Sequence, residues 1–179
     1  MSESRAPIVI FACGNPSRGD DALGPLLLDR LHGWLARQGL AADFELISDF
    51  QLQIEHALDL EGRRLALFID AGEQTPAPFV FRQVDTGDAG PPGSHALAPE
   101  SVLAVFRRVS REKPPAAFVL CVRGERFALG EALGALVRRH AEAAFALLTD
   151  LCANSGLAYW QQVAHSSVLA RSRSHPPKY

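Results

Sequence analysis

Apolar runs and polar breaks alternate along the chain, and this alternation predicts strands separated by helices. Five runs rich in β-branched or aromatic residues have the length of strands, at residues 7–13, 43–48, 65–69, 79–84 and 116–122. The runs at 7–13 and 65–69 are continuously apolar, as expected of strands covered on both faces, whereas 79–84 alternates like an edge or antiparallel strand.

Helical spacing of apolar residues follows several of these runs. After Asp20, the residues Leu23, Leu27 and Leu31 share one face of a predicted helix, which Gly39 ends. Further helices are predicted at 52–60, 99–108 and 129–154. Because each crossover between parallel strands lays its helix on a face of the sheet, this order predicts an α/β fold. We expect a three-layer αβα sandwich with a mostly parallel five-stranded sheet and one antiparallel strand.

The chain length of 179 residues suits a single domain with one packed core. Near the end, Arg171, Arg173 and Lys178 lie among Ser, His and Pro residues, and no acidic residue follows Asp150. A segment of that composition buries too little apolar surface to order itself. The sequence therefore predicts a single α/β domain over residues 1–160 and a flexible tail over 161–179.

Composition excludes several classes of function. The net charge of −2 gives no reason to expect a nucleic-acid partner. No apolar run approaches the roughly 20 residues that cross a bilayer, and the N-terminus lacks a secretory apolar region. The three cysteines are far apart and odd in number, so they indicate reduced core thiols rather than disulfides or a zinc site. A cytoplasmic monomer without membrane partners is expected.

Polar residues gather where the predicted strands end. The loops after the first two strands and the end of the third carry Asn15, Asp20, Asp21, Asp49, Gln51, Glu55 and Asp70. Ligands of parallel α/β sheets bind at the carboxyl ends of the strands, so these side chains are predicted to share one rim.

Each of the more prominent side chains also has a purely structural interpretation. Asp20 and Asp21 could cap a helix and occupy its first turn, each stabilising it by roughly 0.5–1 kcal/mol. Asp70 could belong to a turn, and His95 could be an exposed loop histidine. If Asp21, Asp70 and His95 converge instead, two carboxylates and one imidazole would suit zinc, nickel or iron(II).

Three motifs resemble one known family. They are Gly14-Asn15 followed by Asp20-Asp21 and Gly24, then Phe68-Ile69-Asp70-Ala71, and finally Ser94-His95. Together they resemble the hydrogenase maturation endopeptidases, which process [NiFe]-hydrogenase large subunits, over most of residues 7–150. The resemblance implies that Asp21, Asp70 and His95 are metal ligands. The metal would be nickel already inserted in the large-subunit precursor, so no permanently bound cofactor is expected.

The resemblance also suggests a subgroup and further roles. Residues 49–56 and 123–131 are similar to proteases of the cytoplasmic, NAD-reducing or bidirectional hydrogenases. The resemblance implies that Asn15, Gln51 and Glu55 contact the precursor. No Ser-His-Asp arrangement, GxSxG elbow or HExxH motif is present, so the hypothesis is an aspartic-type mechanism with Asp49 as proton acceptor. Ala12-Cys13 departs from the Gly-x-Gly-Asn start of most members.

Three other functions remain open on the sequence alone. The same ligands could serve a resident-metal hydrolase acting on another substrate. A nickel-sensing chaperone could bind the precursor without cutting it. A dinucleotide-binding module ranks lower, because the GxGxxG spacing is absent and acids would repel a pyrophosphate.

Overall fold

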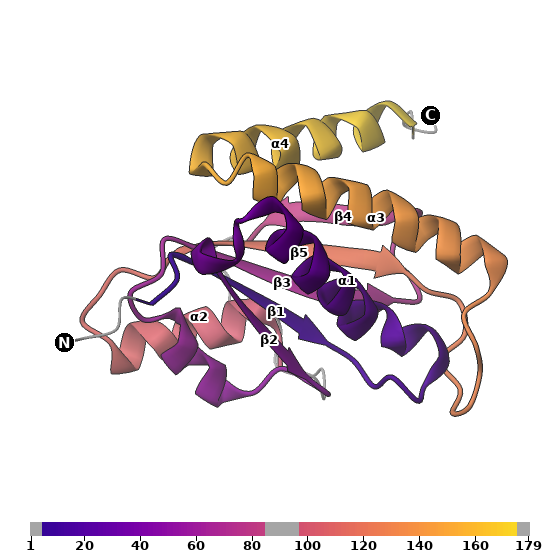
Figure 1. Ribbon diagram of the computed structural model, residues 1–179, viewed down its shortest axis with the longest axis horizontal. Helices are drawn as coiled ribbons and strands as arrows, with labels where there is room; N and C mark the ends of the chain where they lie inside the picture. Colours follow the sequence, from indigo (N-terminus) through magenta and orange to yellow (C-terminus); the bar gives the residue numbers. More distant parts are fainter. Residues whose placement is uncertain (1–4, 85–96, 175–179) are drawn as a thin grey trace, which may run out of the picture.

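The computed structural model describes residues 5–84 and 97–174, and side chains as far as residue 167. The described residues form a five-stranded sheet in the order β2-β1-β3-β5-β4, flanked by helices on both faces (Figure 1). Its strands are β1 Ile8–Cys13, β2 Phe44–Asp49, β3 Leu65–Gly72, β4 Phe79–Gln83 and β5 Ala116–Arg123. All neighbouring pairs are parallel except β4 with β5, which is antiparallel. The predicted fold class is confirmed.

One face of the sheet is covered by three helices, α1 Leu23–Gln38, α3 Ala135–Ala153 and α4 Leu157–Ser174 (Figure 1). Trp160 of α4 is fully buried there, and its ring meets Phe118 edge-on with centroids 5.3 Å apart. The Trp160 indole Nε1–H donates to the carbonyl oxygen of Leu151 at 2.9 Å. The polar tip of this large side chain is thereby satisfied inside the core.

The opposite face is covered by the 3₁₀ segment η3 Ile54–Leu60 and by α2 Pro99–Val109. Its core is smaller, and Phe11 and Phe68 stack at its centre with ring centroids 4.9 Å apart. Two short 3₁₀ turns, η1 Gly19–Ala22 and η2 Ala41–Asp43, complete the fold. Helix α1 ends where predicted, because Gly39 adopts the left-handed conformation with φ 71°.

Two predicted boundaries are wrong. The flexible tail predicted from residue 161 is instead helical as far as Ser174, since Trp160 and Ala164 anchor α4 on the sheet. The domain thus extends well beyond residue 160. The helix predicted from residue 129 begins only at Ala135, because Gly130 has a left-handed φ of 79° that interrupts a helix.

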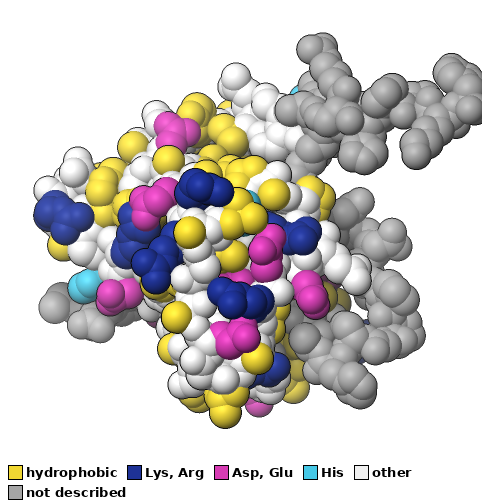
Figure 2. Space-filling model, turned by 90° about the vertical axis from the view of Figure 1, so that its right-hand side faces the viewer, with side chains coloured by type: hydrophobic (Ala, Val, Ile, Leu, Met, Phe, Trp, Pro, Cys, Tyr) yellow, Lys and Arg dark blue, Asp and Glu magenta, His cyan; other side chains and the backbone are white. Residues whose placement is uncertain are grey.

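No helix within residues 5–84 and 97–174 is long and apolar enough to span a bilayer. On the face shown in Figure 2, acidic and basic side chains lie next to one another rather than forming a patch of one sign. This mixture agrees with the small net charge of −2.

Candidate functional site

A row of four chemically reactive side chains crosses the sheet where the apolar core ends. Cys13 of β1 is paired with Asp49 of β2, and Asp70 of β3 with Cys121 of β5. Ala12 of β1 is paired with Ile69 of β3, one residue before Cys13 and Asp70, so the row continues over all four strands. Since paired residues of parallel strands point to the same face, all four side chains lie on the face of η3 and α2.

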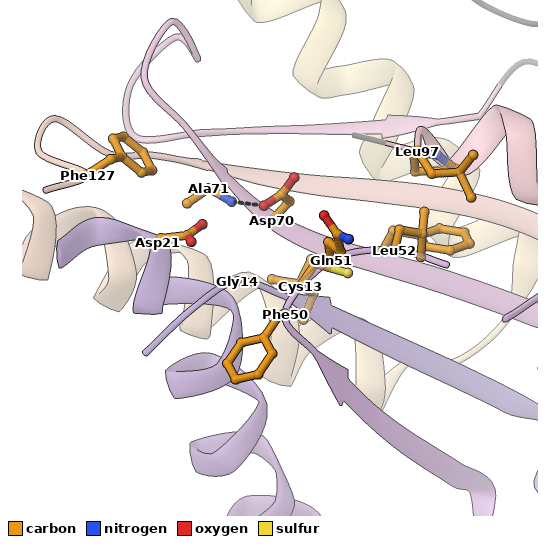
Figure 3. Close-up of a pocket in the computed structure, with 13 residues that line it drawn as sticks. Cys13, Gly14, Asp21, Phe50, Gln51, Leu52, Asp70, Ala71, Leu97 and Phe127 are labelled. Atoms are coloured by element: carbon orange, nitrogen blue, oxygen red, sulfur yellow. Dashed lines mark hydrogen bonds between the residues drawn. The ribbon is translucent and has the colours of Figure 1, made fainter. Parts of the chain in front are cut away.

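A pocket of about 270 Å³ opens at this row. Figure 3 shows the carboxylates of Asp21 and Asp70 in it, with Gln51 and Cys13 nearby. Leu52, Leu97 and Phe127 supply apolar parts of the wall. A largely apolar pocket with a few convergent polar groups is the usual form of a binding site.

Asp70 has a perturbed carboxyl group. It lies inside β3, which pairs with β5 as far as Gly72, so the interpretation as a turn residue is wrong. The surrounding protein limits hydration of the carboxyl, although the side chain reaches solvent through the pocket mouth, and this burial raises its pKa to about 6. The N–H of Ala71, which donates to Oδ1 at 2.8 Å, lowers the pKa, and the charge of Asp21 raises it. Asp21 and Asp70 therefore sense each other electrostatically.

Asp21 is held by the loop that follows β1. The Asn15 N–H donates to its Oδ2 at 2.9 Å. Gly14 permits this turn, because its φ is 145° and a Cβ there would lie 1.9 Å from the Asp21 carbonyl oxygen. The glycine motif thus lets the chain fold closely onto the acid, which leaves the carboxylate at the pocket wall.

Asp20 has a different task from Asp21, and it is not the helix cap that its position predicts. Its side chain makes no cap hydrogen bond to η1 or α1. Instead Oδ2 accepts from the N–H groups of Glu125 and Arg126 at 2.6 and 2.8 Å, and the residue is only 1% exposed. Asp20 therefore ties the first loop to the loop after β5. Local sequence gives no signal for partners more than 100 residues away.

Asp49 lines a second pocket of about 220 Å³, together with Pro16, Pro25 and Ser48. Its Oδ1 accepts from the N–H of Phe50 at 2.6 Å. Gly14 and Phe50 line both pockets, so the two are neighbours. Phe50 is 68% exposed, and this large apolar side chain stands beside the site without a cover among the described residues.

His56 was not singled out by the sequence, yet it lies against Asp49. Its Nε2 is 3.6 Å from Asp49 Oδ2, and its Nδ1 accepts from the Gln53 N–H at 2.9 Å. The imidazole is almost fully buried and tilts against the Phe11 ring. The Gln53-x-x-His56 spacing is that of a capping box, which was the one available sequence signal.

The cysteines of the row are not activated thiols. Burial raises the pKa of Cys13 to about 12, with further increases from the charges of Asp70, Asp49 and Asp21. Burial also raises the pKa of Cys121, whose Sγ lies 3.0 Å from Thr75 Oγ1. A thiol is nucleophilic as the thiolate, so the structure gives Cys13 no support as a nucleophile.

The remaining candidate residues divide into three groups. Gln51 lines the larger pocket, and Asn15 reaches the site through its backbone N–H. Glu55 is exposed on η3 and lines neither pocket. His95 lies outside the described residues, and within those residues no three His, Cys, Asp or Glu side chains converge as a metal site.

Among known proteins, the comparisons found matches in solved structures only. No family profile and no curated protein matches the sequence. A [NiFe] hydrogenase maturation protease HycI from Thermococcus kodakarensis KOD1 superimposes with a TM-score of 0.61 at 21% identity, covering 84% of this chain and 94% of that one. The Escherichia coli hydrogenase maturating endopeptidase HybD gives 0.63 at 19%, covering 83% and 93%. The chain has the fold of the hydrogenase maturation proteases.

A third neighbour, an endopeptidase from Escherichia coli, gives a TM-score of 0.63 at 21% identity over 83% of this chain and 93% of that one. Each of these proteins is covered almost completely, so the likeness extends over the whole α/β domain of this fold. The fold implied by the motifs at Asp21 and Asp70 is thereby confirmed. The resemblance to proteases of NAD-reducing hydrogenases stays a prediction.

Proposed function

We propose that the protein is a nickel-dependent endopeptidase that removes the C-terminal extension of a [NiFe]-hydrogenase large-subunit precursor. One observation carries this proposal: Asp21 and Asp70 line one pocket at the carboxyl ends of the strands and interact through their charges. The names of the neighbours, which are hydrogenase maturation proteases, support the reaction and the kind of substrate.

The precursor's nickel ion would bind between the two carboxylates. Two acids that repel each other around a partly dehydrated pocket bind a divalent cation more readily than they bind protons at neutral pH, because the cation relieves the repulsion. We propose that His95 supplies the third ligand as a neutral imidazole. The ion belongs to the substrate, so a precursor without nickel would dock poorly.

Asp49 is the proposed proton acceptor. It is separated from Asp70 by one intervening strand, β1, and two strand spacings amount to roughly 10 Å. The Cys13 side chain lies between the two acids, and the two pockets share Gly14 and Phe50. In this proposal the scissile peptide bond lies across Cys13, with the ion at the Asp70 end and the attacking water at the Asp49 end. Asp49 would accept a proton from the water as the water oxygen attacks the carbonyl carbon. Asp49 would then give that proton to the leaving amine as the C–N bond breaks.

The other proposed contacts are with the substrate protein. Gln51 lines the larger pocket, and the backbone N–H of Asn15 holds Asp21, which also lines it, so these two would contact the peptide around the ion. Glu55 is exposed beyond the pockets and would contact the folded precursor. The similarity of residues 49–56 to proteases of cytoplasmic, NAD-reducing or bidirectional hydrogenases supports a precursor from a hydrogenase of that class.

The decisive assay mixes the purified protein with nickel-loaded and nickel-free precursor and measures the intact mass of the product. Loss of the C-terminal peptide from the nickel-loaded form alone is expected. Binding without any change in mass would refute the peptidase and favour a nickel-sensing chaperone. Stoichiometric zinc in the isolated protein, with cleavage of other substrates, would favour a resident-metal hydrolase.

The His95→Ala variant tests the third ligand in the same assay. Circular dichroism and the melting temperature should match those of the wild type, because the sequence predicts His95 to follow a loop, outside the apolar runs that form the core, while precursor processing stops. Unchanged cleavage by this variant would remove His95 from the proposed ligand set.

A further inference from the structure

The His56 side chain is more constrained than a helix cap requires. Its Nδ1 accepts the Gln53 N–H, which is one half of the capping box at the start of η3. The other ring nitrogen, Nε2, is aimed at Asp49 Oδ2 from 3.6 Å. The cap uses Nδ1 only, so Nε2 remains available to act on Asp49.

The hydrogen-bond pattern also fixes where the imidazole hydrogen sits. A nitrogen that accepts an N–H carries no hydrogen of its own, so neutral His56 must carry its hydrogen on Nε2. Contact with Phe11, at a ring-centroid distance of 5.3 Å, holds the plane of the ring. The result is an N–H donor fixed in direction and facing the carboxylate.

The surroundings of Asp49 show what this donor would do. Oδ1 is already bound by the Phe50 N–H at 2.6 Å, whereas Oδ2 has His56 as its nearest donor among the contacts of the described residues. At 3.6 Å the Nε2–H acts on Oδ2 through electrostatic attraction rather than a hydrogen bond. Together with the Phe50 N–H, this attraction favours one orientation of the carboxylate beside the second pocket. A reacting group held in one geometry reacts faster than a mobile one.

We propose that His56 is a positioning residue for Asp49: its Nε2–H orients the carboxylate that accepts the proton from the attacking water. The inference rests on the proposed function, because it gives Asp49 the role of base. His56 touches neither substrate nor metal ion in this account, and it acts only through Asp49.

Two conservative variants separate positioning from capping. In His56→Asn, the side-chain oxygen lies at the position of Nδ1 and can still accept the Gln53 N–H, while the donor toward Asp49 is lost. In His56→Gln, the amide nitrogen lies at the position of Nε2 and can still donate to Asp49, while the cap is lost. We expect His56→Asn to melt near the wild-type temperature and His56→Gln to melt lower.

The cleavage rates should show the opposite order. His56→Asn should lower kcat about tenfold with little change in KM, and His56→Gln should keep kcat within about threefold of the wild type. In an Asp49→Asn background, His56→Asn should cost nothing further. Wild-type kcat in His56→Asn, or the same loss in both backgrounds, would overturn the proposal. If His56→Asn fails to fold, His56→Gln decides alone: retained kcat supports positioning and a lost kcat refutes it.

A readout without the precursor distinguishes this inference from the proposed function. Nitrogen NMR of the wild type should show the hydrogen of His56 on Nε2, and the carboxyl carbon signal of Asp49 should move in His56→Asn but not in His56→Gln. A hydrogen on Nδ1 of His56 would overturn the positioning role, even if the protein cleaves its precursor. An Asp49 carboxyl carbon signal that shifts in neither variant would overturn it as well. Should the wild type fail to cleave while these signals hold, only the proposed function fails.

Discussion

The two faces of the sheet are formed by the same strands but present different side chains. The face of α1, α3 and α4 is filled mainly by apolar side chains, including Trp160 and Phe118. The face of η3 and α2 is apolar as far as the row that contains Phe11 and Phe68, and its next row carries acids and thiols. Stability thus resides mainly on the first face, and reactive groups lie where the second face loses its cover.

This division shows how a fold can keep neighbouring carboxylates in a partly buried pocket. Burial of Asp70 beside Asp21 costs stability on one face, and the well-packed opposite face offsets that cost. If the division is correct, substitutions on the two faces should affect different measurements. The predictions below test it from the largest expected effect to the smallest.

Replacement of the central acid should have the largest effect on activity. Asp70→Asn removes a charged ligand but keeps an oxygen that can accept the Ala71 N–H, so the fold should persist. We expect cleavage of nickel-loaded precursor to fall about 1,000-fold, measured by intact mass over time. Asp59→Asn, which changes an acid of η3 outside both pockets, is the matched control and should cleave normally.

Truncation on the other face should affect folding instead. Trp160→Ala opens a cavity beside Phe118 and Phe81 and leaves the Leu151 carbonyl without its donor. The free energy of unfolding should fall by about 3–5 kcal/mol, measured by denaturant titration. In the fraction that stays folded, kcat should equal that of the wild type. A lower kcat would show that the two faces are coupled.

The third prediction concerns the pH dependence of stability. Because the pKa of Asp70 is about 6 in the folded protein against an ordinary value of 3.8, its ionised form destabilises the fold. That penalty is absent below about pH 4, grows as the pH rises and is complete above about pH 6. Asp70→Asn should therefore melt higher than the wild type at pH 7.5 and equally at pH 3.5. A variant less stable at pH 7.5 would contradict the raised pKa.

The smallest effect is expected at the thiol between the acids. Since the pKa of Cys13 is about 12, the thiol stays protonated and cannot act as nucleophile. Cys13→Ala should cleave within about threefold of the wild type, and iodoacetamide should leave wild-type cleavage unchanged. A complete loss in Cys13→Ala, with folding intact, would show that Cys13 takes part in the chemistry.

The sheet was more predictable than the site, for physical reasons. Continuous apolar runs record burial on both faces, so β1 and β5 could be located to within a residue. Helix α4 was missed because its first residues anchor it through Trp160, while its later residues have the composition of a solvated tail. Tertiary contact, which local composition does not contain, orders that segment.

Within the site, strand ends could be predicted but partners could not. The sequence predicts that Asp21, Asp70 and Gln51 share one rim, because parallel strands end at one edge of the sheet. The structure has all three in the lining of one pocket. The bonds of Asp20 to Glu125 and Arg126 join loops that are distant in sequence, so no local pattern predicts them. The approach of His56 to Asp49 depends on how η3 turns back over β2, which only the fold determines.

The central claim is that Asp21 and Asp70 recognise the nickel ion of the precursor, and its most direct test is a binding measurement. Precursor is immobilised in nickel-loaded and nickel-free form, and initial binding of the wild type and of Asp70→Asn is compared by interferometry. The wild type should bind the nickel-loaded form at least about tenfold more tightly, and Asp70→Asn should lose that preference. Equal affinity of the wild type for both forms would contradict the account.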